Sequence, residues 1–133
     1  MSDTTTRTGI SHVGIVSINV RNQDAAIDFY THKLGFEKTT DAPMGPGARW
    51  VEVTPPGAQT RLTLIGEGTP AYEPDRIGHH IACTFEVNDF EATCAELKRR
   101  GVAFKEEPQK QPWGWWAEIL DQDGNVIGLH ANA

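Results

Sequence analysis

The chain has 133 residues, 38% of them hydrophobic, so we expect residues 1–133 to form a single globular domain. Its net charge of −6 argues against nucleic acid as a partner, because phosphate binding requires a basic face. No run approaches the roughly 18 consecutive apolar residues of a membrane span, and the polar stretch Met1–Gly9 lacks a secretory-signal pattern. We therefore expect no membrane partner, a cytoplasmic location and a start of the chain that frays.

The first half of the chain is predicted to fold as a strand, a helix and three further strands. Alternating hydrophobic residues predict a strand over 15–20, and Asn22 is a suitable cap for a helix that ends at Gly35. The next three strands are predicted at 36–41, 49–54 and 61–65. Two glycines and two prolines within 43–47 predict a turn or flap between the first two of these.

The second half repeats this order after a connecting segment. Residues 67–78 contain Gly, Pro and charge without periodicity, and we interpret them as a linker. A strand is predicted over 83–87, followed by a helix that Asp89 caps and Gly101 ends. The last three strands are predicted at 102–106, 113–120 and 125–130.

The two halves keep a common register along their length. Trp50-Val51-Glu52-Val53 lies 66 residues before Trp116-Ala117-Glu118-Ile119, and Gly35 lies 66 residues before Gly101. An offset that is maintained through helix end and third strand indicates a duplicated module. The predicted fold class is therefore α+β, with two βαβββ modules, about 10–66 and 79–131. They are expected to form a concave mixed sheet with the helices on its outer face.

Strand alternation predicts that the concave face is polar and contains tryptophan, which is unusual for a core and suits a ligand. The candidate ligand-binding residues on this face are Trp50, Glu52, Arg61, His80, Trp116, Glu118 and His130. Glu52 and Glu118 occupy equivalent places in the two modules. They fit ordinary exposed strand residues as well as they fit recognition of a polar or cationic ligand, or a general base. The sequence assigns no catalytic residue.

These features together resemble the vicinal oxygen chelate superfamily, which includes glyoxalase I, extradiol dioxygenases and bleomycin-resistance proteins. Residues 20–36 are similar to the family's first strand and helix, and Phe85–Asp89 to their counterpart in the second half. Asp121–Asn125 is similar to the turn before its last strand, with Gln122 where the family has proline. The resemblance covers about 10–131. It implies a homodimer, because the family usually assembles its cups in dimers by pairing halves within or between chains.

Members of the family that use a metal hold a divalent ion with His and Glu from four strands. Counted from the family's anchor residues, these positions fall on Ile15, Thr63, Ala82 and Gly128. None is a suitable ligand, so the resemblance implies neither metal nor other cofactor at that place. His80 and His130 share the predicted face. They remain open as ligands of a displaced metal, as proton-transfer groups or as rim residues.

The function predicted is that of a metal-free, small-molecule binding protein similar to the bleomycin-resistance branch. The acidic chain, the paired Glu52 and Glu118 and the tryptophans suit a planar or cationic organic compound. The alternative is an enzyme: a lyase, isomerase or dioxygenase of the glyoxalase type with a displaced metal or a glutamate base. Metal in the purified protein favours the enzyme, whereas tryptophan quenching by a ligand favours binding.

Overall fold

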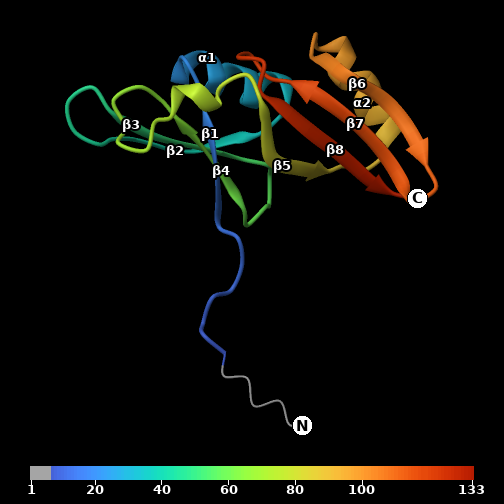
Figure 1. Ribbon diagram of the computed structural model, residues 1–133, viewed down its shortest axis with the longest axis horizontal. Helices are drawn as coiled ribbons and strands as arrows, with labels where there is room; N and C mark the ends of the chain where they lie inside the picture. The colour runs from blue at the N-terminus through green and yellow to red at the C-terminus, as the bar shows by residue number, and fades with distance from the viewer. Residues whose placement is uncertain (1–6) are drawn as a thin grey trace.

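The computed structural model describes residues 7–133 and contains two four-stranded sheets with their helices (Figure 1). In chain order the elements are β1 (Ile15–Asn19), α1 (Gln23–Asp28), a π-helical turn η1 (Phe29–Lys33), β2 (Glu37–Pro43), β3 (Arg49–Thr54), β4 (Arg61–Ile65), a 3₁₀ turn η2 (Pro74–Arg76), β5 (His80–Glu86), α2 (Phe90–Arg99), β6 (Ala103–Gln111), β7 (Gly114–Leu120) and β8 (Val126–Asn132). The predicted fraying of the start falls in part on residues 1–6, outside the described residues. No described helix combines the length and apolarity needed to cross a membrane.

Both modules have the same strand order, β1-β4-β3-β2 in the first and β5-β8-β7-β6 in the second. The outer strands β1 and β5 run parallel to β4 and β8, and the other neighbours are antiparallel. The predicted α+β class and the two βαβββ modules are therefore confirmed. The strands form two separate four-stranded sheets, which lie on opposite sides of the molecule in the view of Figure 1, instead of one continuous sheet.

The predicted strands are all present, and the largest changes of bounds are at the end of β6, which lies at Gln111 instead of residue 106, and at the start of β5. This strand begins at His80, three residues before the predicted start. His80 pairs with Val126 and Thr84 with Gly128, so four steps along β5 match two steps along β8. This register shift marks a bulge, although Ile81, Cys83 and Phe85 still alternate with more exposed residues along the strand.

The two main helices begin differently. The Asn22 side chain accepts a hydrogen bond from the Ala25 amide at 2.8 Å, so the predicted cap of α1 is confirmed. Asp89 lies at the predicted start of α2, but it makes no side-chain cap because its backbone is left-handed, with φ of 47°. At this helix start the Thr93 hydroxyl donates to the Asn88 carbonyl at 2.8 Å instead.

A buried polar network joins the two modules behind their common hydrophobic core. The Tyr30 hydroxyl donates to Asp121 Oδ2 at 2.8 Å. Asn125 Nδ2 donates to the same oxygen at 2.9 Å and to the Asn19 carbonyl at 3.1 Å. Asn125 Oδ1 accepts from the Gly78 amide at 2.8 Å. Because these groups are buried, each needs its partner, and the network fixes the modules against each other.

Tyr30 is expected to make the folded state sensitive to high pH. Burial, and then the charge and hydrogen bond of Asp121, raise the pKa of Tyr30 well above its usual 10. Above pH 10 the unfolded chain releases this proton while the folded chain keeps it, so stability falls as pH rises, by about 1.4 kcal/mol per pH unit. Urea denaturation at pH 9 to 11 should show this slope in the wild type and a shallower one in Tyr30→Phe. Equal slopes would contradict the prediction.

Candidate functional site

On the first module, a carboxylate lies beneath an arginine and a tryptophan. Glu52 is 3% exposed and sits on β3, with Trp50 two residues before it. Its oxygens accept from Trp50 Nε1 at 2.9 Å, from Thr40 Oγ1 at 3.1 Å, and from Arg61 Nη1 at 3.2 and 3.3 Å. Arg61 reaches it from β4, with a side chain that is 43% exposed. Alternation alone placed these side chains on one face, but it did not indicate that Glu52 would be covered.

On the second module, two histidines each face a glutamate. His80 Nε2 lies 3.3 Å from both carboxylate oxygens of Glu118, although β5 and β7 are not neighbours in the sheet. His130 Nδ1 lies 2.8 Å from Glu86 Oε2. Glu86 belongs to this face by alternation, but it was not among the predicted site residues. Each pair places an imidazole nitrogen within hydrogen-bonding reach of a carboxylate.

Three rings form an aromatic cluster, defined here as Trp113, Trp116 and His130. Trp113 stacks on His130, with centroids 5.8 Å apart and ring planes 15° apart, and contacts Trp116 edge-on at 6.5 Å. Trp113 is 55% exposed because it lies in the two-residue turn between β6 and β7. The predicted site omitted Trp113, because the predicted strand 113–120 placed it on the face opposite Trp116, whereas β7 begins only at Gly114. The sequence feature that indicated an exposed tryptophan here was the run Trp113-Gly114-Trp115-Trp116, which is too bulky for one core position. Trp115 instead stacks on Phe90 of α2.

The four positions of the family metal lie at Ile15, Thr63, Ala82 and Gly128. Thr63 is fully buried, and its hydroxyl donates to the Val51 carbonyl at 3.1 Å. A Cβ at Gly128 would lie 2.4 Å from the Trp116 ring, so no ligand side chain fits there in this arrangement. Within residues 7–133, no group of three or more His, Cys, Asp or Glu is placed to hold an ion. The residues present therefore do not fit this metal centre.

The predicted site residues fall into two clusters. Trp50, Glu52 and Arg61 interact on the first module, and His80, Trp116, Glu118 and His130 lie on the second. Among the described residues, no hydrogen bond or ion pair joins the first cluster to the second. The candidate residues therefore form two separate groups, one on each sheet.

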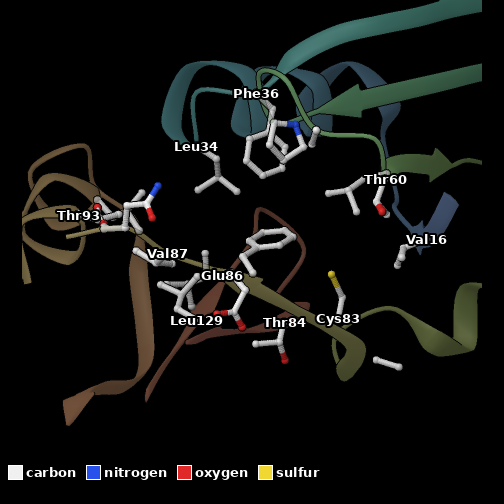
Figure 2. Close-up of a pocket in the computed structure, with 18 residues that line it drawn as sticks. Val16, Leu34, Phe36, Thr60, Cys83, Thr84, Glu86, Val87, Thr93 and Leu129 are labelled. Atoms are coloured by element: carbon white, nitrogen blue, oxygen red, sulfur yellow. Dashed lines mark hydrogen bonds between the residues drawn. The ribbon is translucent and has the colours of Figure 1, made fainter. Parts of the chain in front are cut away.

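A hollow of about 750 Å³ is lined by residues of both modules, and its lining includes Glu86, the carboxylate that faces His130 (Figure 2). Phe36 and Leu34 line it from the first module, and Cys83, Val87 and Leu129 from the second. Of these, Leu34, Phe36, Cys83 and Val87 are half-buried, whereas Leu129 is only 2% exposed.

Cys83 is expected to react slowly with thiol reagents although it borders this hollow. Burial raises the pKa of its thiol from 9.0 to about 11. At pH 8 this leaves about 100-fold less thiolate than an unperturbed thiol provides, and the thiolate is the reacting species. Ellman's reagent should modify the native chain about 30- to 100-fold more slowly than the denatured chain. Because Cys94 is only 2% exposed, Cys83→Ser should abolish the slow native reaction. Equal rates in both states would contradict the prediction.

Comparison with known proteins identifies relatives over nearly the whole chain. The family model of the Glyoxalase/Bleomycin resistance protein/Dioxygenase superfamily matches residues 9–129. TnmS3, an antibiotic binding protein from Streptomyces sp. CB03234, is 39% identical with a TM-score of 0.82, covering 96% of this chain and 100% of that chain. A member of the same superfamily from Sphaerobacter thermophilus DSM 20745 is 36% identical with a TM-score of 0.82, covering 92% and 98%.

A relative known from its sequence agrees with this assignment. The Bacillus subtilis (strain 168) protein YetH is 37% identical over 120 residues, which are 90% of this chain and 98% of YetH. The match covers both modules and their connection, so the resemblance is not limited to one repeat. The chain therefore belongs to the Glyoxalase/Bleomycin resistance protein/Dioxygenase superfamily.

Proposed function

We propose that this chain is a small-molecule binding protein and that it holds a planar organic compound on the aromatic cluster. The observation that carries the proposal is the position of Trp113, which stacks on His130 and is nevertheless 55% exposed. An exposed aromatic side chain gains the most binding free energy when another ring system covers it. The similar protein TnmS3 is an antibiotic binding protein, and we extend ligands of that kind to this chain.

The charges around the aromatic cluster favour a ligand with a polar or cationic group near its ring system. Glu118 and Glu106 are paired across β7 and β6, so their side chains share one face. Glu86 lies beside His130 on the same sheet. A cation bound near these carboxylates would gain attraction from them and from the tryptophan rings.

The binding proposal is tested by calorimetric titration with planar compounds. Trp113→Ala is expected to weaken binding about tenfold or more, because a central tryptophan often dominates a binding surface. Trp115→Phe is the matched control, since Trp115 packs against Phe90 and leaves the aromatic cluster unchanged. Equal weakening by both substitutions, or no binding of any planar compound, would refute the proposal.

We further propose that the protein is a homodimer in which the first module of one chain faces the second module of the other. Each group of candidate residues is then one half of a site, a half-site, and a partner copy supplies the other half. Apolar side chains that a partner can cover are exposed beside them, with Ile10 87%, Val13 67% and Ile15 39% exposed. A two-fold dimer would then contain two equivalent sites.

Mixing two variants that are each impaired in binding an anionic planar compound distinguishes pairing between chains from pairing within a chain. Arg61→Gln impairs only the first half-site, and Trp113→Ala only the second. If the site forms between chains, a mixed dimer has one intact site, and random exchange restores about a quarter of all sites. If it forms within one chain, mixing restores none. Sedimentation analysis supplies the mass, and a monomer would refute the dimer.

The enzyme alternative is supported by one observation, the 3.3 Å approach of His80 Nε2 to Glu118. A histidine oriented by a carboxylate is a suitable proton-transfer pair. Metal content of protein purified without chelator, together with thermal shifts on adding nickel, zinc, manganese or iron, tests this alternative. Stoichiometric metal that is lost in His80→Ala would favour the enzyme over the binding protein.

A further inference from the structure

We infer that Arg61 determines ligand specificity on the first module by binding an anionic or carbonyl oxygen of the ligand. The inference rests on the proposed function, because it names the chemistry that one half of the same site recognises. The expected charge of the ligand group on this module is therefore changed. Glu52 in the sequence suggested a cationic group, whereas Arg61 favours an anionic one.

Glu52 is closed to a ligand on this face. Its side chain is 4% exposed, and donors from β2, β3 and β4 surround the carboxylate. A carboxylate accepts about four hydrogen bonds, and the four contacts from Thr40, Trp50 and Arg61 supply that number. A cationic ligand would have to displace Arg61 before it could reach Glu52.

Arg61, in contrast, retains most of its donors. Only Nη1 contacts Glu52, and no acceptor within residues 7–133 bonds to its Nε or Nη2. A guanidinium has five N–H donors in a planar fork that matches a carboxylate or a similar group of oxygens. The 43% exposed side chain therefore presents unused donors to the solvent side of the sheet.

The buried carboxylate makes Arg61 a better receptor than a free arginine. Because Glu52 holds one nitrogen of the fork, the remaining donors are oriented before the ligand arrives, and less side-chain entropy is lost on binding. Glu52 is thus a positioning residue, and Arg61 is the group that contacts the ligand. A ligand oxygen with negative charge would form a short, charge-assisted hydrogen bond there.

Three anthracene derivatives that share one ring system test the inference: anthroate, anthracenemethanol and protonated aminomethylanthracene. In calorimetric titrations at neutral pH, the wild type is expected to bind the anion about tenfold more tightly than the alcohol. Arg61→Gln should abolish this preference and leave the affinity for the alcohol within about twofold. Arg61→Lys keeps the charge without the fork and should retain only part of the preference.

Two further variants separate recognition from folding. Glu52→Gln combined with Arg61→Gln leaves no buried charge unpaired, so it should keep a folded melting transition and still lose the preference. Arg49→Gln removes an arginine that is 35% exposed and bound to Asp24 of α1, and it should change no affinity. Equal loss of affinity for all three compounds in Arg61→Gln, or a preference for the anion over the alcohol that survives in this variant, overturns the inference and leaves the proposed function standing. Absence of binding by all three overturns the proposed function and this inference with it.

Discussion

Replacing Asn125 with alanine is expected to lower the free energy of unfolding by about 2–4 kcal/mol. The side chain is 1% exposed and bonds three groups: the Asn19 carbonyl, the Gly78 amide and Asp121. Alanine removes these partners and leaves a small cavity, and each buried group without a partner costs about 1–3 kcal/mol. Urea denaturation followed by tryptophan fluorescence measures the loss.

Asn132→Ala is the matched control for this substitution. Asn132 is an exposed asparagine at the end of β8, the strand that begins directly after Asn125, so its replacement is expected to change the free energy of unfolding by less than about 0.5 kcal/mol. The contrast between the two variants separates the buried network from the general effect of removing an amide. An equal loss in both, or a negligible loss in Asn125→Ala, would show that the network does not stabilise the contact between modules.

The fold could be predicted because each element carries its own local signal. Alternation marks β1, Asn22 marks the start of α1, and Gly35 ends the helical segment with a positive φ of 79° that glycine adopts without strain. Because the second half repeats the first, the same order of elements could then be predicted for the second module. The same reasoning failed where tertiary contacts decide the outcome, as at the bulge of β5 and at the left-handed Asp89.

The candidate site was less predictable because alternation gives the face of a residue, but not what covers it. Glu52 lies where alternation placed it, yet Arg61 and Trp50 enclose it. Trp113 lies in a turn, outside any alternating pattern, and its ring returns to stack on His130. Neither feature follows from spacing along the chain, since both depend on side chains from other strands.

Gly128 connects the missing metal ligand to the aromatic cluster. It holds the fourth family position on β8, where β7 places Trp116 over it, and a Cβ there would lie 2.4 and 2.9 Å from atoms of the Trp116 ring. The indole thus occupies the space that a ligand side chain would need. The absence of a ligand at 128 and the presence of an aromatic surface are therefore consequences of the same packing.

Gly128→Ala is accordingly expected to displace the Trp116 ring and cost about 1–3 kcal/mol of stability, with a loss of affinity for planar ligands. Gly128 has no left-handed backbone, so the cost comes from crowding and not from φ. The matched control is the same substitution in Trp116→Ala, where only the 3.0 Å approach to Thr84 Oγ1 remains, so the additional cost should be smaller. Denaturation of all four chains gives the coupling energy directly. A Gly128→Ala cost that is the same in both backgrounds would show that Trp116 does not occupy this space, and the link between the absent ligand and the aromatic cluster would then be lost.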